Sequence, residues 1–164
     1  RLCALIILVN KYKKEDNEKI YQYYMKHLTA INNWDLVDSS APYIVGDYLY
    51  KHPEKTTILF DLVRSDNLWI RRISIISTFT FIRNNQFKPT LDLAKLLLED
   101  NHDLIHKALG WMLREIYKRD SDLIRKFLIQ NYAQIPRTTL RYAIERMDKR
   151  ERKKYLKGDF DVPN

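Results

Sequence analysis

The sequence has few of the residues that build turns and cross-links. It contains three glycines and one cysteine among 164 residues. The scarcity of glycine disfavours a sheet with many tight turns. A single cysteine, Cys3, excludes a disulfide within the chain and fits a reducing cytoplasm. The opening apolar run, LCALIILV, is too short to cross a membrane and lacks a signal-peptide cleavage pattern. We therefore expect a cytoplasmic helical protein with no membrane partner.

Positive charge is in excess. The chain has 29 basic and 21 acidic residues, a net charge of +8, with 45% hydrophobic residues. This composition is ordinary for a soluble protein, and the length suits a single domain over residues 1–164. A basic surface favours a polyanionic partner such as nucleic acid. Many soluble proteins are mildly basic, so the charge alone does not establish a nucleic-acid partner.

Apolar residues recur at helical spacing almost throughout the chain. Asn32 or Asn33 can cap a helix that starts at Trp34, and Asp66 or Asn67 can cap the next long one. Pro89 and Pro136 suit the first turn of a helix. The predicted helices are Leu2–Lys13, Asn17–Ile31, Trp34–Tyr50, Lys55–Ser65, Leu68–Arg83, Pro89–Leu98, Asp103–Lys118, Ser121–Asn131, Pro136–Met147 and Lys149–Leu156.

The helices repeat in pairs. Trp34 and Trp69 lie 35 residues apart, and the same period aligns Ile73, Ala108 and Ala143. Two helices per repeat of this length indicate an all-α, right-handed α-solenoid, in which the second helices form a concave face. The period places Val37, Arg72, Lys107 and Tyr142 at equivalent positions, one residue after Leu36, Arg71, His106 and Arg141. Basic residues thus recur on neighbouring helices, which predicts a basic groove.

Trp34 and Asp38 are four residues apart and share one face of their helix. An indole face attracts positive charge and a carboxylate neutralises it, so the pair suits a planar, cationic substrate. Taken alone, the pair favours the interpretation of a core tryptophan beside a solvent-exposed aspartate. The surrounding motifs decide between these interpretations.

The segments NWDLVDSSAP, NLWIRRISIIS and IHKALGWMLREIYKRD, in this order and spacing, resemble the AlkD-type DNA alkylation repair glycosylases, whose fold is a HEAT-like repeat solenoid. With the opening RLCALIILVNKYKK and the later PRTTLRYAIERM, the resemblance covers nearly the whole chain. It implies an N-glycosyl hydrolase that excises purines alkylated at N3 or N7 from duplex DNA in base excision repair. It implies no metal and no cofactor.

The resemblance also assigns roles to residues. It makes Asp38 the catalytic acid position, gives Trp34 and Trp111 contacts to the sugar and backbone of the lesion, and places Arg72 near the DNA backbone. It further implies that the damaged base stays stacked, whereas other glycosylases flip it into a pocket. Helices expected before Arg1 are absent from the sequence. We expect a monomer that is associated with the nucleoid when bound to DNA.

The chemistry agrees with these roles. A purine alkylated at N3 or N7 is cationic and already a good leaving group, so the enzyme needs to stabilise the sugar as it acquires oxocarbenium character. A carboxylate such as Asp38 can do this and can position the attacking water. Phosphate contacts are expected from basic residues on adjacent helices. These are Arg71, Arg72, Lys107 and Arg141.

Other interpretations remain. The chain could be a non-catalytic relative that binds unusual DNA structures, or a HEAT-like scaffold that binds a protein. His102 and His106 are four residues apart, but no third metal ligand is evident in the sequence. Ser39 and Ser40 have no identifiable partner histidine, which disfavours a nucleophilic serine.

Overall fold

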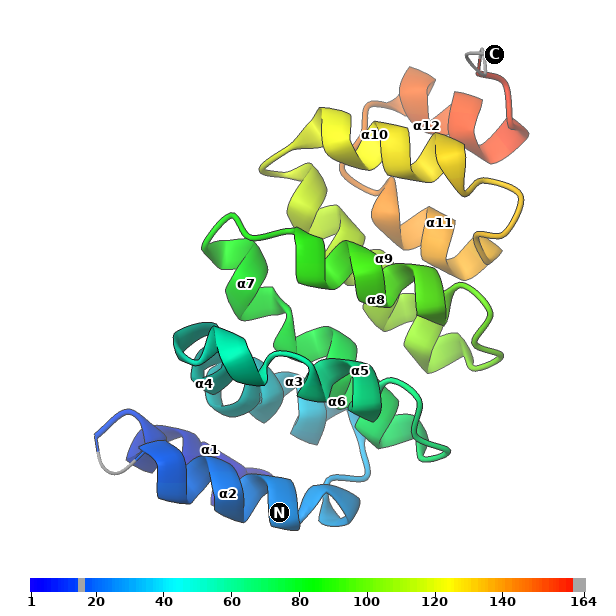
Figure 1. Ribbon diagram of the computed structural model, residues 1–164. Helices are drawn as coiled ribbons and strands as arrows, with labels where there is room; N and C mark the ends of the chain where they lie inside the picture. The colour runs from blue at the N-terminus through cyan, green and yellow to red at the C-terminus, as the bar shows by residue number, and fades with distance from the viewer. Residues whose placement is uncertain (15–16, 161–164) are drawn as a thin grey trace.

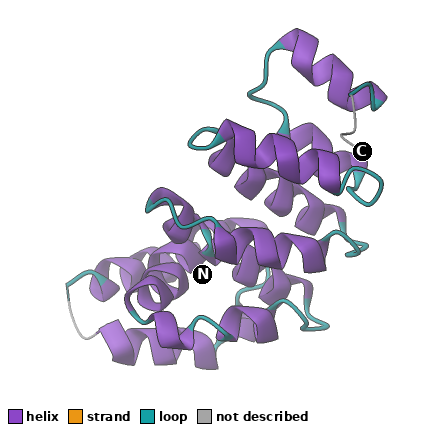
Figure 2. Ribbon diagram, turned by 45° about the horizontal axis from the view of Figure 1, so that its top comes forward, coloured by secondary structure: helices purple, strands orange, loops and turns teal. Residues whose placement is uncertain are grey.

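The computed structural model describes residues 1–14 and 17–160, which are helical and contain no strand (Figures 1 and 2). Short 3₁₀ turns lie at Leu28–Ala30 and Pro53–Lys55, and a π-helical segment spans Pro42–Gly46. The α-helices are α1 (Leu2–Tyr12), α2 (Asn17–Lys26), α3 (Trp34–Ala41), α4 (Asp47–Lys51), α5 (Ile58–Leu62), α6 (Leu68–Ser77), α7 (Phe79–Arg83), α8 (Lys88–Leu97), α9 (Asp103–Tyr117), α10 (Ser121–Gln130), α11 (Arg137–Ala143) and α12 (Lys149–Lys157).

The helices form an elongated stack of pairs that runs from the N-terminus to the C-terminus (Figure 1). Consecutive pairs contact each other mainly through one layer, in which α3 packs on α6, α6 on α9 and α9 on α11. Helix α5 packs on α6 and α10 packs on α9, whereas α8 packs mainly on α9 and also contacts α6. This arrangement confirms the predicted all-α class and is compatible with an α-solenoid.

The core lies between the two layers. The three positions that the 35-residue period aligns, Ile73, Ala108 and Ala143, are all fully buried. Each lies on a helix of the layer that joins the pairs, so the repeat in the sequence corresponds to a repeated packing position. No helix of the described residues is long and apolar enough to cross a membrane.

Side chains at the helix starts act largely as the sequence predicts. The Asn33 side chain accepts a hydrogen bond from the backbone N–H of Trp34, and the Asn67 side chain accepts one from Trp69. Both asparagines satisfy a donor that the first turn leaves free. Pro89 lies in the first turn of α8. Pro136 instead precedes α11, because its ψ of 140° is extended and places it in the cap position.

Three long predicted helices are interrupted. The predicted helix Leu68–Arg83 is divided at Thr78 into α6 and α7. The predicted helix Trp34–Tyr50 contains the π-helical segment, which begins at Pro42. Proline has no backbone N–H and its ring clashes with the carbonyl four residues earlier, so a regular α-helix cannot continue through it. The predicted helix Asn17–Ile31 ends at Lys26. There the His27 ring contacts the Tyr23 carbonyl at 2.7 Å and replaces the bond that the next helical N–H would make.

Glycine permits two close approaches between neighbouring helices. A Cβ atom added at Gly46 would lie 2.2 Å from the backbone oxygen of Ser77, and one at Gly110 would lie 2.6 Å from that of Thr139. These separations are too short for any side chain. The π-helical segment therefore packs directly against α6, and α9 against α11.

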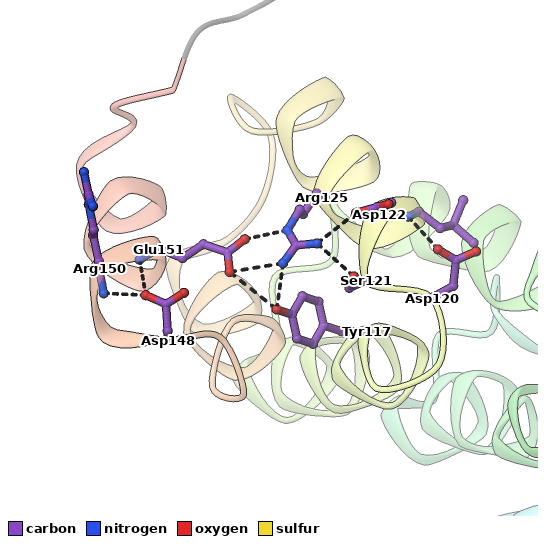
Figure 3. A network of polar contacts seen from close by, with 9 residues as sticks. Tyr117, Asp120, Ser121, Asp122, Arg125, Asp148, Arg150 and Glu151 are labelled. Carbon is purple, nitrogen blue, oxygen red and sulfur yellow. Dashed lines mark hydrogen bonds and ion pairs between the residues drawn. The ribbon is translucent and has the colours of Figure 1, made fainter.

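A polar network attaches the last helix to the stack (Figure 3). The Arg125 guanidinium of α10 pairs with the Glu151 carboxylate of α12 at 2.6 Å, and the Tyr117 hydroxyl donates to the same carboxylate. The hydrogen bond to Glu151 raises the pKa of Arg125. Asp148 caps α12 by accepting from the N–H groups of Arg150 and Glu151. The predicted charged helix at Lys149–Leu156 is thus held by half-buried and exposed polar contacts.

Candidate nucleic-acid interface

One cavity of about 360 Å³ lies across the layer that joins the helix pairs. It brings together five of the seven site residues that the sequence predicts, from three helices that are distant in the chain. Asp38 and Trp111 lie on the same cavity and not on opposite faces. Its lining residues are Trp34, Asp38, Arg72, Leu104, Lys107, Trp111, Arg114 and Tyr142.

Arg72 holds the carboxylate of Asp38 in a two-point ion pair. The Nε atom donates to Oδ1 at 3.0 Å and the Nη2 atom donates to Oδ2 at 2.8 Å. Such fork-to-fork pairs fix the orientation of a carboxylate as well as its position. The Arg72 Nη1 atom donates to the backbone carbonyl of Leu104. Only 6% of the Arg72 side chain is exposed, against 19% of Asp38, so the carboxylate is the member of the pair that reaches the cavity.

The helix that carries Asp38 is irregular directly after it. Pro42 stands four residues later and has no N–H to offer to the Asp38 carbonyl, so the chain adopts the π-helical segment there. The Thr80 hydroxyl donates to the Pro42 carbonyl at 2.6 Å. Asp38 is therefore held on both sides, by Arg72 through its side chain and by a segment anchored to the neighbouring helix through its backbone.

Trp34 is the first residue of α3 and has 54% of its surface exposed. This exposure excludes the interpretation of Trp34 as a core residue. Exposing a large apolar side chain to water is unfavourable. The exposed indole of Trp34 lines the cavity that contains Asp38. The sequence predicts that these two residues share one helix face, and in the structure both line the same cavity.

Trp111 lies on the other side of the cavity and is half-buried. Its ring lies 5.9 Å from the ring of Phe79, centroid to centroid, and its Nε1 atom donates to the Glu115 carboxylate at 3.1 Å. These two contacts from α7 and α9 fix the orientation of the indole. The cavity is thus bounded by two tryptophans, one exposed and one anchored, with the Asp38 carboxylate in the same lining.

The predicted phosphate ligands differ in their surroundings. Lys107 lines the cavity and pairs with Asp103 at 2.8 Å. Arg71 lies outside this cavity and is half-buried, where it pairs with Asp100 at 2.7 Å. Arg141 is exposed and has no polar partner among the residues that the structure describes. Of the four predicted ligands, Arg71 and Arg72 have their guanidinium donors engaged inside the protein, and their phosphate contacts remain predictions.

The period that the sequence suggests is wrong by one residue at α3. Val37, which it aligns with Arg72, is fully buried. The residue that meets Arg72 is Asp38, which lies 34 positions before it. The N-cap residues of α3, α6, α9 and α11 are Asn33, Asn67, His102 and Pro136, so successive repeats are 34, 35 and 34 residues long. Neighbouring repeats therefore differ in length by one residue.

Three lining residues were not among the predicted site residues. Leu104 contributes the carbonyl that receives Arg72, and no sequence signal identifies such a backbone role. Arg114 follows Trp111 by three residues on the same helix face and pairs with Glu145 of the next turn region. The 35-residue period aligns Tyr142 with Arg72 and Lys107. This alignment could have identified Tyr142 as a residue of the site.

Electrostatics in the cavity are dominated by close pairs. The hydrogen bond to Asp103 raises the pKa of Lys107. The hydrogen bonds from Lys107 and Thr138 lower the pKa of Asp103.

Within the described residues no group of three or more His, Cys, Asp or Glu side chains is placed to hold a metal ion. Ser40 is fully buried and bonded to Tyr24, away from any nucleophilic role.

Comparison with known proteins identifies the family of the chain. The family model described as DNA alkylation repair enzyme matches residues 1–147, which include every residue that lines the cavity. No curated protein sequence matches the chain. Because the family model covers most of the chain, the protein belongs to the DNA alkylation repair enzyme family.

Proposed function

We propose that the protein is a DNA glycosylase that excises cationic N3- and N7-alkylated purines from duplex DNA. The observation that supports this best is the Asp38 carboxylate, which Arg72 fixes in a cavity whose lining also includes Trp34 and Trp111. The proposal includes a right-handed HEAT-like solenoid whose concave face receives the DNA. The stacking of helix pairs in Figure 1 supports that arrangement.

The proposed reaction requires no acid to activate the leaving base. As the bond between the sugar and the cationic purine breaks, its electron pair neutralises the base, and positive charge develops on the sugar. Asp38 stabilises that charge and positions the water that attacks the same carbon. The proton of the water passes to the carboxylate or to solvent. The products are a neutral alkylpurine and an abasic site.

The two tryptophans have a separate role in this proposal. Their faces attract the developing cation on the sugar and exclude bulk water from it. Trp111 is held by Phe79 and Glu115 and provides a fixed surface. Trp34 is exposed and is free to close on the nucleotide. The developing sugar cation thus meets aromatic faces and a carboxylate in one place.

Arg72 acts as a positioning residue in this proposal. Its donors are engaged by Asp38 and by the Leu104 carbonyl, and its side chain is nearly buried. We therefore assign phosphate binding at the cavity first to Lys107, whose pairing with Asp103 is more exposed and which can exchange that partner for a phosphate. Arg141 provides a second exposed cation on α11.

Base release from duplex DNA that contains N7-methylguanine tests the proposal. We expect single-turnover excision by the wild-type protein and a loss of about 10²-fold or more in Asp38→Asn, the scale for removing one preorganised electrostatic group. Asp35→Asn is the matched control, because Asp35 lies on the same helix outside the cavity and accepts from the N–H of Leu36. Binding of the lesion duplex should survive in both variants.

The outcomes separate the alternatives. Wild-type binding of duplex DNA without any base release would indicate a non-catalytic relative. A protein that neither binds DNA nor releases base would indicate a scaffold. Equal excision by wild type and Asp38→Asn would remove Asp38 from the mechanism. The retention of the Asp38–Arg72 pair between two tryptophans favours the catalytic alternative, since a scaffold does not require it.

A further inference from the structure

A second cavity, of about 500 Å³, opens at the other end of the helices that carry Asp38 and Arg72. It shares no residue with the first cavity. Its walls come from the end of α1, the π-helical segment, α4 and the end of α7. The lining residues are Tyr12, Lys13, Asn17, Pro42, Tyr43, Asp47, Lys51, Thr80, Arg83 and Asn84.

The lining carries an excess of positive charge. Lys51 pairs with Asp47 at 2.7 Å and offsets its charge. Arg83 is exposed and has no polar partner in the part of the chain that the structure describes. The Lys13 ammonium lies 5.6 Å from the centroid of the Tyr43 ring, a contact that leaves its charge available to an anion. Lys13 and Arg83 thus remain as two uncompensated cations on opposite walls.

This cavity continues the surface of the candidate site. Arg83 ends α7, the short helix that follows α6 after a break at Thr78. The same short helix carries Phe79, whose ring contacts Trp111 of the first cavity. Helices α4 and α7 lie at the same side of the stack (Figure 1). A ligand that covers Asp38 and extends along these helices reaches Arg83.

A duplex presents a second strand to the surface beside the strand that it places at Asp38. The major groove of B-DNA is about 12 Å wide, and phosphates of opposite strands stand on either side of it. A strand held at Asp38 would therefore present its complement near the second cavity. We propose that Lys13 and Arg83 bind phosphates of the second strand of the duplex. This inference rests on the proposed function, because it assumes that the damaged strand lies at Asp38.

The test compares duplex and single-stranded DNA of the same sequence. The double variant Lys13→Gln, Arg83→Gln removes two phosphate contacts, so the slope of log affinity against log salt for the duplex should become shallower by about two. Binding of the single strand should keep its wild-type slope. The charge-conserving variant Lys13→Arg, Arg83→Lys should keep the wild-type slope for both.

A matched control removes two cations from the other layer. Lys95 of α8 and Lys126 of α10 are exposed and lie outside both cavities. Their replacement by glutamine makes the same change in net charge and should leave the duplex slope unchanged. If the Lys13, Arg83 variant also keeps the wild-type duplex slope, the second-strand site is overturned.

Two further outcomes keep this test separate from the proposed function. An equal loss of slope for duplex and single strand would assign Lys13 and Arg83 to the damaged strand and overturn the inference. A wild-type protein whose duplex affinity is independent of salt would contradict the proposed function itself.

Discussion

Gly110 of α9 lies directly against Tyr142 of α11, and a Cβ atom at Gly110 would stand 2.5 Å from the Cβ atom of Tyr142. This contact brings Tyr142 to the edge of the candidate site. In an exposed helix, replacing glycine by alanine stabilises by about 0.5–1 kcal/mol. Gly110→Ala should instead destabilise by about 1–3 kcal/mol, because the methyl group has no room. Denaturant unfolding measures the sign, and a gain in stability would contradict the close packing.

The pair of Arg72 with Asp38 predicts coupled variants. Arg72→Ala leaves a mostly buried carboxylate without its partner, which should cost about 3–5 kcal/mol of stability. Asp38→Asn in the same protein should recover part of that loss, since no unpaired charge remains. A double-mutant cycle by denaturant unfolding gives the coupling free energy. Additive effects would show that the two side chains do not stabilise each other.

Asp103 should restrain Lys107 from binding DNA. Asp103→Asn removes a negative charge beside the cavity and releases the ammonium from its 2.8 Å pair. Duplex affinity should rise by a few-fold at low salt, and the increase should fade as salt screens the charges. Thr138→Val is the control, because it removes a hydrogen bond to Asp103 without changing charge. An unchanged affinity in Asp103→Asn would exclude Lys107 as a phosphate ligand.

The stability of α12 should decrease at low pH. The N–H groups of Glu151 and Arg150 lower the pKa of Asp148. Because the pKa of Asp148 is lower in the folded state, its ionised carboxylate stabilises α12 at pH values above the unfolded pKa of about 4. This stabilisation is lost as the pH falls through the lower pKa of the folded state. Asp148→Asn keeps a good cap but cannot titrate. Chemical shifts of the α12 amides between pH 3 and 7 should reveal the transition in wild type only.

Much of the fold follows from local signals. Periodic apolar residues and the caps at Asn33 and Asn67 located the helices, because both act within a few residues of the chain. The repeat located the buried positions Ile73, Ala108 and Ala143, since each repeat buries the same face. The interruption at Pro42 could also have been expected from proline chemistry.

The site was only partly predictable. Trp34, Asp38, Lys107 and Trp111 carry recognisable side chains at recognisable spacings, and the structure places them on one cavity. Sequence periodicity could not distinguish Arg71 from Arg72, which are adjacent but pair with different carboxylates, on Asp100 and Asp38. Which partner each arginine meets depends on the approach of neighbouring helices, and a one-residue difference between repeats decides it.

The π-helical segment at Pro42–Gly46 has a consequence for how this surface can change. A π-helical turn contains one residue more than an α-helical turn, so it rotates everything that follows by about 100° relative to an uninterrupted helix. Asp38 precedes the segment and faces the first cavity, whereas Asp47 follows it and faces the second. Deleting one residue between them would leave Asp38 in place and turn Asp47 and Lys51 away. The lining of the second cavity can therefore change while that of the first is kept, although residues of one stretch of helix line both.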